Sequence, residues 1–196
     1  MAPRRHAGCW HSDMQQPIRY WRLGTTGGDR RHNFWPQMRA SHDIAMGWAD
    51  LGDLRQIVDD ASRLRSTVVG VRATNPLYRG QTNPERSIGY ISDQARQFVR
   101  GIKVGDIVVA ADGLRILGVA RVSGEYRFDH GVDPNAPHRR KVDWVNLDDW
   151  KPPNPPGKRR PQGFLTTCWQ ITDPGTINQI RQHLPRELRH RLNQAA

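Results

Sequence analysis

Apolar and polar positions along this chain follow two periods, and each period predicts a different kind of element. Residues 18–24 alternate between two faces, which is the period of a β-strand, and aromatic side chains stand on both faces. Apolar or alternating runs of similar length predict further strands at 43–48, 106–111, 114–124, 138–147 and 163–171. These short strands, separated by turn residues, indicate that a sheet forms the centre of the fold.

Helical spacing of apolar residues predicts helices over 33–38, 53–61, 87–101, 173–184 and 188–192. Asp53, Ser87 and Asp173 are the expected N-caps of three of them, because their side-chain oxygens can accept hydrogen bonds from free backbone N–H groups. Gly101 is the expected end of the third helix. Residues 67–73 fit either a strand or the edge of a helix, and the pattern leaves both open.

The clearest local signal is a β-hairpin around Asp112-Gly113. An Asp-Gly pair supplies the positive φ angles that a two-residue hairpin turn needs, and apolar strands flank it on both sides. Strands and helices otherwise mix without a strand–helix–strand rhythm. The predicted class is therefore α+β: a curved, mostly antiparallel sheet or partial β-barrel with helices packed around it.

The chain of 196 residues is long enough for one domain with its own core. Residues 1–17 are charged and have no period, so they are expected to form a disordered tail. A single domain over 18–184 and a helical extension over 185–196 complete the expected organisation. No apolar run reaches the length of a membrane span, and the tail lacks the apolar centre of a signal peptide. These features predict a cytoplasmic protein without a membrane partner.

The formal net charge is +11, and 26 of the 30 basic residues are arginine. The planar guanidinium group grips phosphate through two hydrogen bonds, so this balance favours a polyanion as partner. Codon bias toward arginine would give the same composition without any such partner. The basic balance therefore favours nucleic acid without proving it.

Motifs of several enzyme classes are absent from the sequence. It contains no P-loop, no nucleophile elbow, no zinc-deaminase signature and no His-Glu-x-x-His motif. Cys9 and Cys168 fit neither a metal spacing nor a disulfide framework, and Cys168 is expected to be a buried thiol. The sequence therefore predicts a binding protein without catalytic residues, metal or cofactor. Any catalysis would come from a partner.

Four segments together resemble a known family. They are YWRLGTTGG, IAMGWADLGDL, GDIVVAADGLRILGVARVSGEY and HRRKVDW, which span about residues 18–150. This combination resembles the EVE-type, PUA-like domains of McrB-like modification-dependent restriction systems, which are related in fold to YTH readers. The resemblance implies a barrel-like sheet with a pocket for one extruded nucleobase. The sequence does not contain the P-loop motor and nuclease that usually follow such a domain. The chain is therefore either a fragment, a subunit whose partner is a nuclease or motor, or a stand-alone reader.

The resemblance also implies residues for the pocket. Trp48 matches an aromatic wall after the second strand, Tyr126 matches a second wall with Phe128 as reserve, and Thr25 matches the polar end of the first strand. Independently of the resemblance, the carboxylate of Asp50 is a candidate partner for an exocyclic amine. Trp21 alternates on the first strand, so it either packs in the core or lines the pocket.

Phosphate contacts are expected from clusters of basic residues in loops near the pocket. The first cluster is Arg30 and Arg31, the second is Arg139, Arg140 and Lys141, and the third is Lys158, Arg159 and Arg160. The alternative is that these charges simply solvate the surface.

The preferred hypothesis is a reader of modified bases in double-stranded DNA, which flips a methylated or otherwise modified cytosine or adenine into the pocket. Such a reader would be the specificity module of a restriction or defence system. An RNA-binding module of the PUA/YTH kind is the first alternative, because the sequence does not reveal whether the 2′-hydroxyl is read. A nucleic-acid-processing enzyme is the second alternative.

Overall fold

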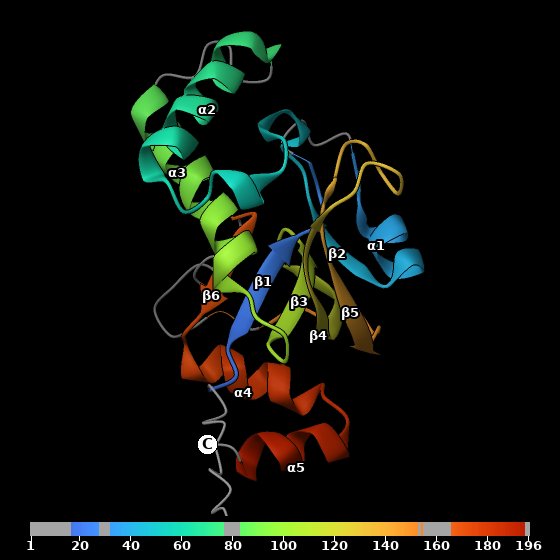
Figure 1. The fold of residues 1–196 in the computed structure, drawn as a ribbon. Helices are drawn as coiled ribbons and strands as arrows, with labels where there is room; N and C mark the ends of the chain where they lie inside the picture. Colours follow the sequence, from blue (N-terminus) through green and yellow to red (C-terminus); the bar gives the residue numbers. More distant parts are fainter. Residues whose placement is uncertain (1–16, 28–31, 77–82, 153, 155–165, 195–196) are drawn as a thin grey trace, which may run out of the picture.

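The computed structural model describes residues 17–27, 32–76, 83–152, 154 and 166–194. Its centre is an open sheet of six strands in the order β2-β5-β4-β3-β1-β6 (Figure 1). The strands are β1 (Tyr20–Gly24), β2 (Asp43–Met46), β3 (Ile107–Asp112), β4 (Arg115–Phe128), β5 (His138–Asn146) and β6 (Cys168–Ile171). Only β1 and β3 pair in parallel within this sheet. The predicted α+β class with a curved, mostly antiparallel sheet is confirmed.

The predicted hairpin between β3 and β4 is present, but its two-residue turn is Gly113-Leu114, because Asp112 is the last residue of β3 and does not have a positive φ. Gly113 has φ +57°, a conformation that costs glycine little because it has no Cβ. The long strand β4 continues through Tyr126 and shifts its register against β5 between Val119 and Ala120 and again between Val122 and Tyr126. Such irregularities increase the local twist of a strand. They therefore help to curve the sheet.

The two faces of the sheet pack against different helices. Trp21 and Leu23 of β1 belong to one apolar cluster, whereas Tyr20 belongs to the other, as the alternation of residues 18–24 predicts. The first cluster includes side chains from α1 (Trp35–Ser41), α2 (Ala61–Thr74) and α3 (Pro84–Arg96). The second includes side chains from α4 (Pro174–Gln182) and α5 (Arg186–Gln194).

The helix boundaries differ from the predicted ones at three places. Asp53 is an N-cap, but of a short 3₁₀ helix over Leu54–Gln56, and α2 begins later with Asp60 as its cap. Residues 67–73, left open by the pattern, are part of α2. The N-cap of α3 is Asn83 rather than Ser87, because Pro84 occupies the first turn, where its missing N–H costs nothing.

Other helix predictions are confirmed. The apolar stripe of α3 is buried, and the helix passes into a π-helical turn over Gln97–Gly101 that ends at the expected glycine. Asp173 caps α4 by accepting a hydrogen bond from the N–H of Thr176. The predicted helix near Asn33 is found as α1, although it runs on to Ser41.

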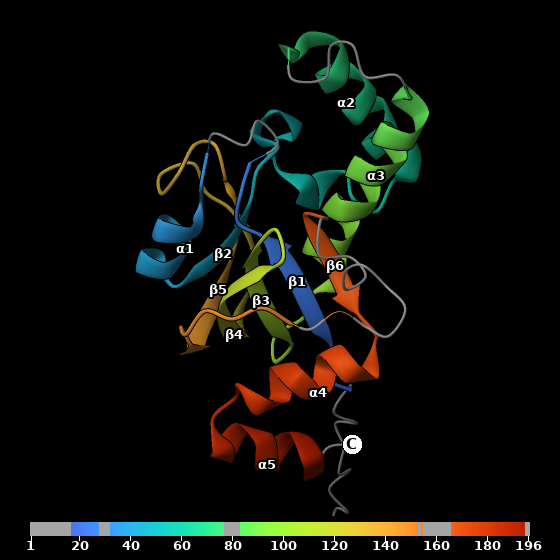
Figure 2. The ribbon, with the colours of Figure 1, turned by 180° about the vertical axis from the view of Figure 1, so that it is seen from behind.

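The helices gather at opposite ends of the sheet. Helices α2 and α3 lie side by side beyond one end, and α4 and α5 lie beyond the other (Figures 1 and 2). No helix in the described ranges is both long and apolar enough to cross a membrane. The predicted tail over 1–17 lies outside the described residues apart from its last position.

Candidate functional site

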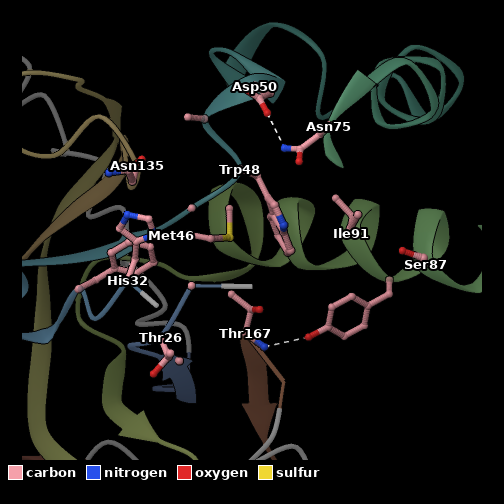
Figure 3. A pocket seen from close by; sticks show the side chains of 16 residues that line it. Thr26, His32, Met46, Trp48, Asp50, Asn75, Ser87, Ile91, Asn135 and Thr167 are labelled. Carbon is pink, nitrogen blue, oxygen red and sulfur yellow. Dashed lines mark hydrogen bonds between the residues drawn. The ribbon is translucent and has the colours of Figure 1, made fainter. Parts of the chain in front are cut away.

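A pocket of about 430 Å³ opens between the end of β1, the loop after β2 and helix α3 (Figure 3). Its volume lies within the usual range of small-molecule sites. The residues that line it are Gly24, Thr26, Gly27, His32, Phe34, Met46, Gly47, Trp48, Ala49, Asp50, Asn75, Ser87, Tyr90, Ile91, Asn135 and Thr167. These residues come from distant parts of the chain, and the fold brings them together at one end of the sheet.

Trp48 forms a wall of this pocket, as the resemblance implies. Its backbone has φ 63° and ψ 43°, the left-handed conformation that a bulky L-residue seldom adopts. This turn ends the alternation of β2 and directs the half-buried indole into the pocket, where Met46 and Ile91 stand on either side of it in Figure 3. A flat ring beside apolar side chains is a surface on which another flat ring can stack.

A buried hydrogen-bond chain holds the backbone of Trp48 in this strained conformation. The hydroxyl of Tyr126 accepts from the N–H of Leu54 (3.2 Å) and donates to Nδ1 of His138 (2.9 Å). Nε2–H of His138 then donates to the carbonyl oxygen of Trp48 (3.1 Å). Burial lowers the pKa of His138 to about 4, so the imidazole is neutral and has one donor and one acceptor nitrogen.

Polar groups surround the apolar wall. Asn75 Nδ2 donates a hydrogen bond to one carboxylate oxygen, Oδ2, of Asp50 (2.8 Å). This amide does not contact the second carboxylate oxygen, Oδ1. On the other side, the hydroxyl of Tyr90 accepts a hydrogen bond from the N–H of Thr167 (3.0 Å). The pocket therefore offers an aromatic surface together with hydrogen-bonding groups that can read the edge of a planar ligand.

Three of the predicted pocket residues lie in the core instead. Tyr126 is 7% exposed and packs edge to face against Phe98, so it does not form a second wall. It supports Trp48 indirectly, through its hydrogen bond to His138. Trp21 is buried, and its indole N–H donates to Asp106. Thr25 is buried and donates to the carbonyl oxygen of Ala111. Successive residues of an extended chain point to opposite faces, so its neighbour Thr26 lines the pocket instead.

The reserve wall, Phe128, also lies away from the pocket. Its ring packs against His130 and His138 and against the core cluster of the first face. Asp50, by contrast, lines the pocket as expected.

The second predicted phosphate cluster is mostly unavailable to a ligand. Arg139 is fully buried, donates to Asp43 (3.1 Å) and reaches a backbone carbonyl, so its charge is already compensated. Arg140 is 1% exposed and donates to the carbonyl oxygens of Phe98 and Val99. The structure thus places both arginines inside the protein rather than on a surface that faces phosphate, because β5 directs their side chains inward.

Lys141, the third member of that cluster, is exposed, but it donates to the carbonyl oxygen of Ser41 and lies 3.5 Å from Asp43. Arg30 and Arg31, and the cluster at 158–160, lie outside the described residues.

The sequence analysis did not predict that α3 and the end of α2 contribute to the pocket. Asn75 follows α2, and Ser87, Tyr90 and Ile91 lie on α3, far from the strands in sequence. His138 was also missed as a support for Trp48. No local pattern in the sequence indicates either contribution. For His138, only the pairing of β2 with β5 sets Met46 opposite His138 and so brings the imidazole to the turn at Trp48.

Titratable side chains elsewhere do not suggest a metal site. Cys168 is buried, and burial raises the pKa of its thiol to about 12, so it stays protonated, as expected of a structural cysteine. Within the described ranges no three His, Cys, Asp or Glu side chains are grouped so that they could hold a metal ion.

Fold and site together define an α+β domain with one aromatic-walled pocket at the end of its sheet. The chain belongs to the family described as a domain of unknown function, DUF8426, whose model matches residues 21–161. No curated protein matches the sequence. Among solved structures it is similar to the YTH domain of the Zygosaccharomyces rouxii MRB1 protein in complex with N6-methyladenosine RNA. The identity is 12% and the TM-score 0.44, over 86% of this chain and 88% of that one.

Proposed function

We propose that this protein is a nucleic-acid reader that takes one extruded nucleobase into the pocket beside Trp48. The observation that carries the proposal is the indole of Trp48, turned into an open pocket by a left-handed backbone and held there by His138. Trp48 also packs against the core, but strained backbone conformations cluster at binding and active sites, so the left-handed turn supports a ligand-binding role for its indole.

The free energies support a base as the ligand. Extrusion of a base costs a few kcal/mol, and stacking on an aromatic side chain returns about 1–3 kcal/mol. Tyr126 lies in the core, so the indole of Trp48 is one aromatic wall and the rings of Phe34 and Tyr90, which also line the pocket, are the candidates for a second. One stacking contact does not by itself exceed the cost of extrusion, so polar and phosphate contacts must add to it. A base that is already unpaired or weakly paired is therefore the preferred ligand.

A modified base fits the apolar part of the pocket. Burial of one methyl group contributes about 0.8 kcal/mol, and Met46, Ile91 and Trp48 offer apolar surface for it. The four segments that resemble EVE-type domains favour modified double-stranded DNA, read for a restriction or defence system with a separate nuclease or motor. A modified base in RNA is the alternative, since the same pocket would take it.

We further propose that the chain reads without cleaving. The neutral His138 is committed to Tyr126 and Trp48, and Asp50 accepts a hydrogen bond from Asn75, which supports a binding role for both side chains. His32 also lines the pocket, so the cleavage test covers it as well. Incubation of the protein with end-labelled duplex, with and without a divalent metal, tests this. Stoichiometric protein should leave the strands intact, and turnover would show an enzyme.

Replacement of Trp48 tests the pocket. We expect Trp48→Gly to reduce affinity for the preferred oligonucleotide by about 1–3 kcal/mol, because the stacking surface is lost. Glycine is the better replacement, since it adopts φ 63° without strain and keeps the turn after β2. Fluorescence anisotropy with matched DNA and RNA strands, each with and without 5-methylcytosine or N6-methyladenine, measures the effect and ranks the ligands.

Trp150→Ala is the matched control for that experiment. Trp150 is a half-buried tryptophan that stacks on His183 beside α4 and does not line the pocket. Its loss should lower stability but leave affinity unchanged. Equal affinity of wild type and Trp48→Gly would remove the pocket proposal, and equal affinity for modified and unmodified strands would remove the modified-base part alone.

A further inference from the structure

Arg22 is a buried cation in the middle of β1 for which packing offers no explanation. Its side chain is 4% exposed, and Nη2 donates to the carbonyl oxygen of Ala111 at 3.3 Å. Nε is buried without a hydrogen-bond partner among the described residues, and no carboxylate in the described part of the chain forms an ion pair with it. Arg139 makes the contrast clear, because its equally buried guanidinium pairs with Asp43.

A buried charge without a counter-ion is costly. Desolvation lowers the pKa of Arg22 to about 10, partly opposed by Tyr90, Cys168 and Asp112, so the side chain remains protonated at neutral pH. Removal of a cation from water destabilises the folded protein unless an anion compensates it. Such a group in a native structure calls for an explanation, and a charged ligand is one.

The guanidinium of Arg22 lies directly behind Gly24, a residue that lines the pocket. Residues 22, 24 and 26 share one face of the extended chain, and Gly24 and Thr26 both line the pocket. Nη1 of Arg22 lies 2.8 Å from the point that a Cβ on Gly24 would occupy. Because Gly24 has no Cβ, the guanidinium can occupy this position next to it.

We propose that the guanidinium of Arg22 binds a phosphate group of the nucleotide whose base stacks on Trp48. The proposal rests on the proposed function, since it names the group that anchors the same nucleotide. Arg22 would bind the phosphate that Arg139 and Arg140 were expected to bind. Those two guanidinium groups already donate to Asp43 and to backbone carbonyl oxygens. A planar guanidinium matches the geometry of phosphate oxygens and adds affinity without selecting a base.

The first test replaces the charge by an apolar side chain of similar length. Arg22→Met should weaken binding of the preferred oligonucleotide by roughly 10- to 100-fold, the loss typical of a hydrogen bond to a charged group. The same variant should melt at a temperature equal to or above that of wild type, because it removes an uncompensated buried charge. A structural role for Arg22 would instead lower the melting temperature and leave the affinity of the folded fraction unchanged, and that result would overturn the proposal.

The second variant keeps the charge and moves it. Gly24→Ala places a Cβ against Nη1, so the guanidinium must shift and affinity should fall without any change in net charge. Combined with Arg22→Met, Gly24→Ala should cost little more, since both act on one contact. Arg121→Met, an exposed arginine on β4, changes the net charge by the same amount and should leave affinity nearly unchanged.

Neutral phosphate linkages identify the ligand group. A single methylphosphonate on either side of the bound nucleotide should weaken binding to wild type at one of the two positions and have no further effect on Arg22→Met. Equal losses in both proteins at both positions would overturn the proposal. If no oligonucleotide binds, the proposed base pocket is refuted, and inorganic phosphate then tests Arg22 separately. A rise in melting temperature with phosphate in wild type but not in Arg22→Met supports an anion site at Arg22. No rise in wild type refutes that site.

Discussion

At the scale of single residues, side chains that look alike in sequence have opposite roles here. Trp48 and Trp21 both border apolar strands, yet Trp48 lines the pocket and Trp21 is buried against Asp106. The left-handed turn at residue 48 makes the difference, since it breaks the alternation that would return the indole to the sheet. The buried His138 supports this turn, so its protonation state matters for the protein as a whole.

The stability of the protein should depend on pH through His138. Its pKa in the folded state, about 4, lies below the ordinary value of 6.5, so protonation favours the unfolded state. This contribution is fully present above about pH 6.5 and is lost as the pH falls toward 4, with a total of roughly 3 kcal/mol. Denaturant unfolding at pH 7, 5.5 and 4.5 measures it.

His138→Gln is the comparison for that measurement. Glutamine keeps a hydrogen-bonding side chain but does not titrate, so the variant should start less stable and lose less stability between pH 6.5 and 4. Carboxylates contribute equally to both proteins and cancel in the difference. Parallel pH profiles would show that His138 is not the titrating group.

At the scale of elements, close approaches of backbone and ring decide how the sheet packs against α1. Gly118 of β4 is buried beneath Trp35, which stands edge to face against Trp144 at a centroid distance of 5.0 Å. A Cβ on Gly118 would lie 2.7 Å from Cη2 of Trp35. The helix and the strand therefore meet where no side chain intervenes.

Gly118→Ala should destabilise the protein by about 1–3 kcal/mol, because the added methyl group forces the Trp35 ring out of its site. Gly70→Ala on α2 is the opposite case: nothing lies within 4 Å of the added atom, and alanine favours a helix by about 0.5–1 kcal/mol. Urea unfolding of both variants measures the difference. A Gly118→Ala protein as stable as wild type would show that Trp35 moves freely.

At the scale of the whole molecule, the proposed function assigns the charge of +11 and the pocket to different parts of a nucleic acid. Under that proposal, exposed arginines attract the phosphate backbone without choosing a sequence, whereas the pocket selects one base. Arg86 precedes the pocket residue Ser87 on α3 and is exposed, so we predict that it contacts the phosphate backbone of a strand bound at the pocket.

Binding should therefore weaken steeply with salt, and Arg86→Gln should reduce the slope of log affinity against log salt by about 1. Arg189→Gln on α5, at the opposite end of the sheet, removes the same charge and should leave the slope unchanged. Titrations at four salt concentrations give the slopes. The same slope for Arg86→Gln and wild type would place the strand on another surface.

Local patterns in the sequence were sufficient for the fold class, the β3–β4 hairpin and the apolar stripe of α3, whereas the aromatic residue after β2 was expected only from the resemblance to EVE-type domains. Period, turn chemistry and capping act over a few residues, so they can be read without knowing the fold. Thr25 was expected in the pocket, but Thr26 lines it. This shows the limit of local patterns, because an error of one residue in a strand moves a side chain to the other face.

Tertiary structure alone decided which charges are free and which rings are exposed. Arg22, Arg139 and Arg140 all lie in strands, but only the pairing of β5 with β2 shows that Arg139 meets Asp43, and only the position of the π-helical turn after α3 gives Arg140 its carbonyls. Arg22 is left uncompensated beside the pocket among the described residues. Charge compensation and concavity depend on contacts between segments distant in sequence, and local patterns contain no information about such contacts.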